Sequence, residues 1–196
     1  FKGYLLDEDI IRLLDYFKTH PAEYPALSIY CKLMLLAPAK RTTLAKLTTA
    51  DFSSDYSVMT VNGVPIELPY SLKIELAQRM QESTAQKTDG SIFARIAGNK
   101  KFKGENINCD LYYALKKSGY AVPKGKESFP VEAIRIAAIL NLVAQNVSLF
   151  AITKIAGMSP KSLWTILETY AKDMVNANIG QQVQAGTVQC SYYNYI

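Results

Sequence analysis

The stretch 129–170, FPVEAIRIAAILNLVAQNVSLFAITKIAGMSPKSLWTILETY, contains three segments with helical signals. The first, 130–145, is apolar along most of its length and has proline in its first turn, where helices accept it. The second, 148–155, starts at a serine that can cap it and stops before Gly157, a typical C-terminal residue. The third, 160–175, has apolar residues at helical spacing. The stretch therefore predicts a helical C-terminal third.

The sequence upstream predicts further helices and one β-hairpin. The hairpin strands, 56–61 and 64–68, flank Asn62-Gly63, a dipeptide that supplies the two positive-φ residues of a type I′ turn. Asp7 is a candidate N-cap for the first helix. The predicted fold class is therefore mainly α with a small antiparallel hairpin. Helices are expected over 7–18, 26–36, 40–47, 71–82 and 107–117, and loops over 88–103 and 121–129.

Composition is that of a globular chain. Apolar residues make up 49% and charged residues 20% of the 196 residues, which excludes disorder of the whole chain. We expect one domain over 1–177 and a tail over 178–196, rich in Gln, Gly and Tyr, that is flexible or docks on a partner. No run of about 18 apolar residues occurs, so no transmembrane helix is expected. The chain starts at Phe1, and a further N-terminal domain outside this sequence stays open.

Histidine and cysteine content excludes several classes of enzyme. The chain has one histidine, His20, and three cysteines that lie far apart. This set cannot form a His-based hydrolase triad or a multi-His metal centre, and it predicts no disulfide framework. Neither a P-loop nor a G-x-G-x-x-G motif is present. We therefore expect no metal and no cofactor, and a cytoplasmic location.

The excess positive charge lies in one segment. The net charge is +5, and residues 95–126 alone carry eight basic and two acidic residues. A concentrated basic segment is typical of proteins that bind a polyanion such as DNA. A solvated basic loop fits the charge equally well, so both interpretations stay open. The basic residues of this segment are Arg95, Lys100, Lys101, Lys103, Lys116, Lys117, Lys124 and Lys126.

Four short motifs follow one another in a specific order. They are GYLLDED at 3–9, KRTTLAKLTTAD at 40–51, FPVEAIR at 129–135 and IAGM at 155–158, and the last residues of the final two are 23 apart. With the hairpin after the second motif, this order resembles the catalytic domain of tyrosine recombinases, the phage integrases and their relatives. The resemblance covers about 4–172. It implies that fold, and double-stranded DNA as the partner.

The resemblance also implies a chemistry. In that family a tyrosine hydroxyl attacks a DNA phosphate, and two arginines hold the nonbridging oxygens. A lysine in the hairpin protonates the leaving oxygen, and histidines position the phosphate and assist proton transfer. Here the first arginine aligns with Lys40, or with Arg41 after a slip of one residue. The turn Asn62-Gly63 contains no lysine.

The remaining positions depart further from the family pattern. Glu132 and Met158 replace the two histidines, Leu167 replaces the nucleophile, and Arg135 alone matches cleanly. Tyr170, three residues beyond Leu167, is either a displaced nucleophile or an aromatic packed in the helix core. Arg135 is either a retained phosphate contact or the ion-pair partner of Glu132 on the same helix face.

Three hypotheses for the function follow. The first is a catalytically inactive recombinase-like protein that binds DNA as a transcriptional regulator or architectural factor of a mobile element such as a plasmid, associated with the nucleoid. Its DNA contacts are the basic segment with Lys40, Arg41 and Arg135, and its tail supports self-association. The second is a divergent active recombinase that uses Arg41, Arg135 and Tyr170. The third is a protein–protein interaction module whose aromatic tail, 192–195, packs on a partner.

Overall fold

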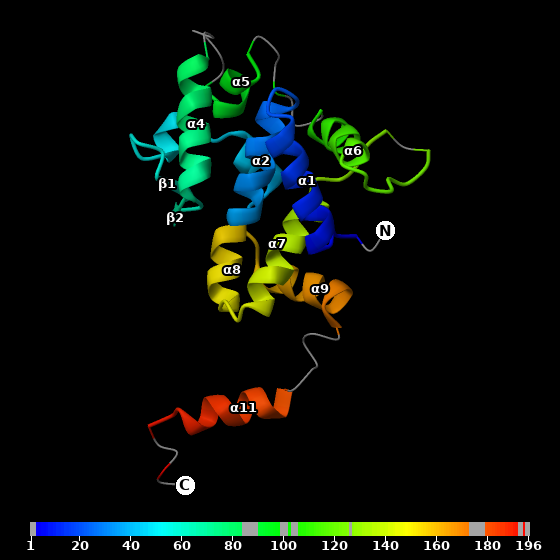
Figure 1. Cartoon of the computed structure of the whole chain (residues 1–196). Coiled ribbons are helices and arrows are strands. Elements are labelled where there is room, and N and C mark those ends of the chain that lie inside the picture. The colour runs from blue at the N-terminus through cyan, green and yellow to red at the C-terminus, as the bar shows by residue number, and fades with distance from the viewer. Residues whose placement is uncertain are drawn as a thin grey trace.

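The computed structural model describes residues 3–83, 90–98, 102, 106–125, 127–172, 179–191 and 194. Its architecture is mainly α with one two-stranded antiparallel sheet, so the predicted fold class is confirmed (Figure 1). The elements are α1 (Asp7–Thr19), α2 (Pro25–Leu36), α3 (Arg41–Ala45), the 3₁₀ turn η1 (Thr49–Asp51), β1 (Val58–Val61), β2 (Val64–Glu67), α4 (Tyr70–Glu82), α5 (Ile92–Ile96), α6 (Ile107–Lys117), α7 (Glu132–Ala144), α8 (Leu149–Ala156), α9 (Pro160–Tyr170) and α11 (Ile179–Val188).

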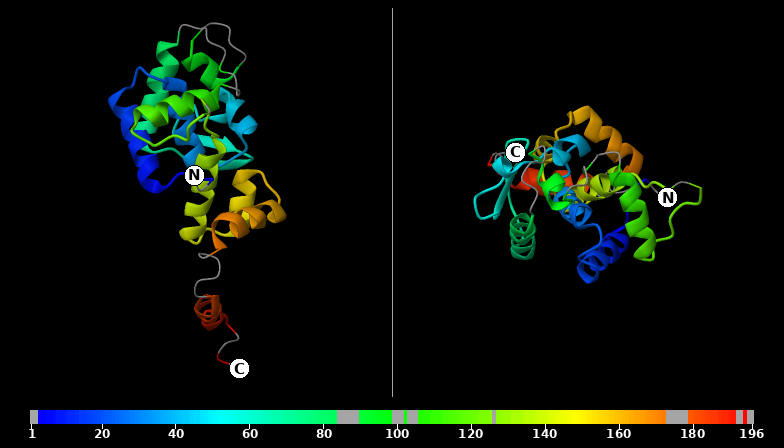
Figure 2. Two further views of the ribbon diagram at one scale, coloured as in Figure 1. Left: turned by 90° about the vertical axis from the view of Figure 1, so that its right-hand side faces the viewer. Right: turned by 90° about the horizontal axis from the view of Figure 1, so that it is seen from above.

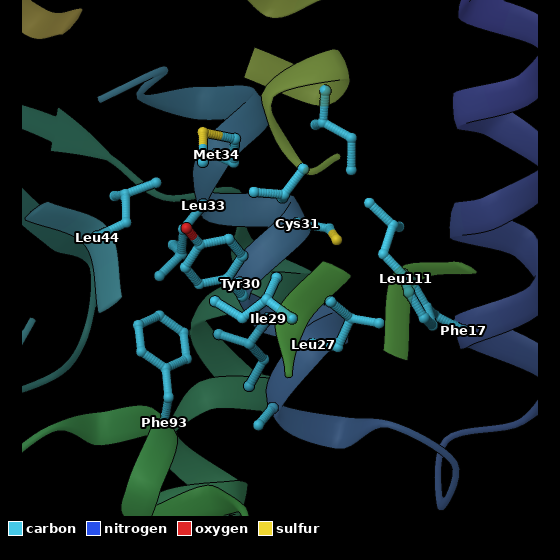
Figure 3. Close-up of a cluster of buried hydrophobic side chains, with 14 of the residues drawn as sticks. Phe17, Leu27, Ile29, Tyr30, Cys31, Leu33, Met34, Leu44, Phe93 and Leu111 are labelled. Carbon is cyan, nitrogen blue, oxygen red and sulfur yellow. The ribbon is translucent and has the colours of Figure 1, made fainter. Parts of the chain in front are cut away.

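Helix α2 is the centre of the larger of two hydrophobic clusters. It begins with proline at its first position, and most of its side chains are apolar and buried. It packs against α1, α3, α4, α5, α6 and α7. Figure 3 shows Leu27, Ile29, Tyr30, Leu33 and Met34 of this helix inside the cluster. A helix that is apolar on most faces must be covered on most sides.

The smaller cluster joins α7, α8 and α9. It contains buried apolar residues of all three helices, including Ile139, Ile152, Leu163 and Leu167. Ser148 Oγ accepts a hydrogen bond from the Ala151 amide at 3.2 Å, which confirms the predicted cap of α8. In Figure 1, α7 runs from the helices around α2 to α8 and α9, so it connects the two clusters.

The hairpin forms at the predicted turn. Asn62 and Gly63 have φ values of 51° and 73°, and Val61 pairs with Val64 on either side of them. Positive φ at both central residues is the requirement of a type I′ turn, whose twist matches that of the two strands. The sequence signal is therefore confirmed.

Some predicted boundaries were wrong. The N-cap of α1 is Leu6, and Asp7 lies in the first turn, where its Oδ1 accepts a hydrogen bond from Asn141 Nδ2 at 2.9 Å. Helix α5 lies within the predicted loop 88–103, because burial of Ile92 and Phe93 stabilises a segment too short to show a period.

The C-terminal region also differs from prediction. Helix α9 ends at Tyr170, five residues before the predicted end. The tail, in which no helical period was recognised, contains helix α11. In Figure 1 and in the left view of Figure 2, α11 lies apart from α7, α8 and α9.

Candidate nucleic-acid interface

Arg135 is a buried cation at the meeting point of three segments. Its side chain is 9% exposed and leaves the first turns of α7. Its Nε donates to the Pro38 carbonyl oxygen at 2.8 Å, and its Nη2 donates to the Ala156 carbonyl oxygen at 3.2 Å. Its Nη1 donates to Glu132 Oε1 at 2.6 Å. Arg135 therefore ties the end of α2 and the end of α8 to α7, and it has the predicted ion pair with Glu132.

Glu132 is the partly exposed partner of the buried Arg135 in this ion pair. Its side chain is 45% exposed, so water still reaches the carboxylate. The pair is an i, i+3 contact on one helix face, a spacing that brings side chains together. The negative charge of Glu132 therefore offsets the positive charge of Arg135.

Lys40 and Arg41 stand at the start of α3, next to this ion pair. Lys40 is exposed and Arg41 is half-buried. The Tyr30 hydroxyl donates to the Arg41 carbonyl oxygen at 3.2 Å. Burial raises the pKa of Tyr30, and the nearby charges of Arg41, Glu132 and Arg135 also act on its hydroxyl. Arg41 and Arg135 thus both lie near the hydroxyl of Tyr30.

The hairpin turn is tied to the end of α8. Asn62 Nδ2 donates to the Ile155 carbonyl oxygen at 2.8 Å. Gly157 follows α8 with φ of 60°, and a Cβ there would lie 2.8 Å from Asn62 Nδ2, so this close approach requires glycine. Met158 lines an open hollow of about 420 Å³ together with Asn62 and Gly157. The turn and the position of the second histidine are therefore neighbours.

The structure thus brings together five of the seven residues predicted at catalytic positions, and Leu167 and Tyr170 lie elsewhere. Lys40 and Arg41, the Glu132–Arg135 pair, and Met158 are linked through the bonds to Pro38, Ala156 and Ile155. Lys40 and Met158 are 118 positions apart in the sequence, and the packing of the helices places them in one region.

Leu167 and Tyr170 are packed against other side chains of the protein. Leu167 is 2% exposed and belongs to the smaller hydrophobic cluster. The Tyr170 ring packs edge-on against Tyr4 with centroids 5.9 Å apart, and it lies so close to Gly3 that a Cβ there would be 2.5 Å from its Cε1. Tyr170 is thus part of a packed aromatic contact between α9 and the N-terminal segment.

The basic residues of 95–126 that the structure describes differ in exposure and in ion pairing. Lys116 and Lys124 are exposed, and Arg95 is half-buried on α5. Lys117 forms an ion pair with Glu23, which raises the pKa of the lysine and lowers that of the glutamate, and it lies 5.4 Å from the Tyr24 ring centroid. The remaining members, Lys100, Lys101, Lys103 and Lys126, lie outside the described residues.

In the part of the chain that the structure describes, no group of three or more His, Cys, Asp or Glu residues could hold a metal ion. None of the helices in this part has the length and apolar character needed to cross a bilayer.

The fold of this chain is similar to that of a known protein. No protein-family model and no curated protein matches the sequence. Among solved structures, the crystal structure of XerA recombinase is similar, with a TM-score of 0.67 and 13% sequence identity. The fold is tyrosine-recombinase-like. The alignment covers 90% of this chain but only 63% of the XerA recombinase chain, and at this identity the likeness establishes the fold alone.

Two residues of the region around Arg135 were missed from the sequence. Tyr30 lies in an apolar helix, where an aromatic residue predicts core packing and gives no sign that its hydroxyl reaches Arg41. Asn62 was recognised as a turn residue, but its bond to Ile155, 93 positions away, has no local sequence signal. Both contacts arise from the packing of distant segments.

Proposed function

We propose that this chain is a DNA-binding protein with a recombinase-like fold that does not cleave DNA, and that it serves as a transcriptional regulator or architectural factor of a mobile element. The fold supports DNA as the partner. The basic segment and the cations Lys40 and Arg41 supply the charge for phosphate contacts, which carry most of the affinity of such proteins.

One observation carries the proposed inactivity. The nucleophile position holds Leu167, which is buried in an apolar cluster, and the nearest tyrosine along the helix packs against Tyr4. A cleaving centre also needs several donors that hold the charge of the transition state, and here Arg135 donates to partners within the protein. Removal of one such donor typically slows chemistry by about 100- to 1,000-fold.

A trapping experiment tests the absence of cleavage. A nicked duplex that traps covalent protein–DNA adducts is incubated with the full chain and with the matched variant Tyr170→Phe. We expect no adduct from either protein, and equal DNA affinity. An adduct from the parent chain that is absent in Tyr170→Phe would establish the divergent recombinase instead.

DNA binding itself is tested by salt titration of a labelled duplex. Affinity for DNA falls with salt by about 0.9 log units per decade for each phosphate contact. Replacement of Lys100, Lys101 and Lys103 by Gln should weaken binding to every sequence and flatten this slope. An unchanged slope would place the interface elsewhere, and absence of binding at low salt would favour a protein–protein interaction module.

The proposed role of the tail is self-association. An apolar hollow of about 500 Å³ lies between α8 and α9, where Phe150 is 82% and Trp164 is 50% exposed. Helix α11 contains no charged residue and exposes Val183 and Val188. These two apolar surfaces are complementary in character. Deletion of the residues after Asn178 should lower the assembly size in sedimentation, with Trp164→Ser as a matched variant of the receiving surface. If both variants assemble like the parent, the tail has no such role.

A further inference from the structure

The segment 38–41, between α2 and α3, is held at both ends by buried side chains. Arg135 Nε donates to the carbonyl oxygen of Pro38 at 2.8 Å. The Tyr30 hydroxyl donates to the carbonyl oxygen of Arg41 at 3.2 Å. The backbone between these two bonds is therefore fixed from the interior of the protein.

Tyr30 is itself rigidly held. It is 0% exposed, its ring packs edge-on against Phe93 with centroids 5.3 Å apart, and it lies 5.9 Å from the ring of Phe102. Figure 3 shows the ring near that of Phe93, within the cluster of buried side chains. Burial raises the pKa of Tyr30, so the hydroxyl keeps its proton and remains a hydrogen-bond donor.

The segment carries charge that is not neutralised locally. Lys40 is exposed and Arg41 half-buried, and within the described part of the chain neither side chain has a hydrogen bond or an ion pair. Residues 24–50 contain no Asp or Glu. Glu132, whose charge acts on the same Tyr30 hydroxyl as that of Arg41, is bonded to Arg135. Two free cations thus extend from a fixed backbone.

We infer that Tyr30 and Arg135 are positioning residues, which hold segment 38–41 so that Lys40 and Arg41 contact the DNA backbone. This inference rests on the proposed DNA binding. It gives Arg135 an indirect role, because its guanidinium bonds Pro38, Ala156 and Glu132. A turn that is fixed before binding loses less conformational freedom when it meets a phosphate, and so binds more tightly.

Equilibrium binding of a labelled duplex at several salt concentrations tests the inference. The full chain is compared with Tyr30→Phe, which removes only the hydroxyl, and with the double variant Lys40→Gln/Arg41→Gln. Lys18→Gln, which removes an exposed positive charge on α1, is the control for loss of charge at another place on the surface. Circular dichroism and thermal unfolding show that each variant is folded at the temperature of the titration.

The expected results separate positioning from a structural role. The double variant should lower the salt slope by about 1–2 units, and Lys18→Gln should leave it unchanged. Tyr30→Phe, with every charge retained, should lower affinity by about 3- to 10-fold at fixed salt, because Arg41 is less well placed.

Two results would overturn the inference while DNA binding stands. One is a folded Tyr30→Phe protein with parental affinity and slope, which would leave the hydroxyl a purely structural bond. The other is a double variant whose slope equals that of the parent or of Lys18→Gln. Absence of DNA binding by the parent chain would refute the proposed function, and this inference with it.

Discussion

Replacement of Arg135 by methionine should strongly destabilise the protein. Methionine has a similar length but no donor, so the Pro38 and Ala156 carbonyl groups lose their charged partner in a buried place. Each unsatisfied buried acceptor costs about 1–3 kcal/mol. Burial of the apolar methionine side chain offsets about 1.5–3 kcal/mol. The loss from two unsatisfied acceptors less this offset gives an expected net loss in the free energy of unfolding of about 2 kcal/mol.

The matched control is Glu132→Gln. The Glu132 side chain is 45% exposed, so its ion pair with Arg135 is screened by water and contributes about 0–1 kcal/mol. Urea unfolding of the parent and both variants, followed by circular dichroism, gives the three values. The reasoning is refuted if Arg135→Met costs less than about 1 kcal/mol, or if Glu132→Gln costs as much.

Three further predictions concern the same fold. Gly157→Ala should lower the free energy of unfolding more than Gly63→Ala. Both positions have positive φ, but only at Gly157 would the new Cβ meet a neighbour, Asn62 Nδ2 at 2.8 Å. Equal losses in urea unfolding would contradict this close approach. Burial raises the pKa of Tyr30, so above about pH 10 only the unfolded state loses this proton, and the parent loses stability as the pH rises. Tyr30→Phe lacks this proton, so its stability should fall less steeply than that of the parent, by about 1.4 kcal/mol per pH unit. Parallel pH profiles of the two proteins would contradict this. The buried Cys31, whose pKa is raised to about 12 by burial, should react with a thiol reagent only as the protein opens, whereas exposed Cys109 should react at once; equal rates would show that α2 is accessible.

Local signals predicted the elements that depend on local chemistry. The Asn62-Gly63 turn forms because both residues adopt positive φ, and Ser148 caps α8 because its side chain reaches the amide of Ala151, three residues on. Helix α5 was missed because a five-residue helix shows no period, and the burial that stabilises it comes from distant segments. Asp7 was assigned as a cap, although the chain turns into the helix one residue earlier.

In the candidate site, too, local contacts could be predicted from the sequence and long-range contacts could not. The ion pair between Glu132 and Arg135 could be predicted, because i, i+3 spacing on a helix brings the two side chains together. The bonds of Arg135 to Pro38 and Ala156 span 97 and 21 positions, and no periodicity or motif encodes them. The order of the motifs predicted that these segments meet, but only the packed helices show which atoms are bonded.

The internal bonds of Arg135 support the proposal that this chain binds DNA without cleaving it. Cleavage needs donors free to follow the charge that develops on a phosphate, and Arg135 has its donors on Pro38, Glu132 and Ala156. Binding needs only positive charge at the right distance from the backbone, and Lys40 and Arg41 keep this charge at the surface. Arg135, whose Nε, Nη1 and Nη2 donate within the protein, also fixes the segment that we propose contacts the DNA backbone. In the proposed function, the absence of cleavage and the contact with DNA therefore both depend on one set of hydrogen bonds.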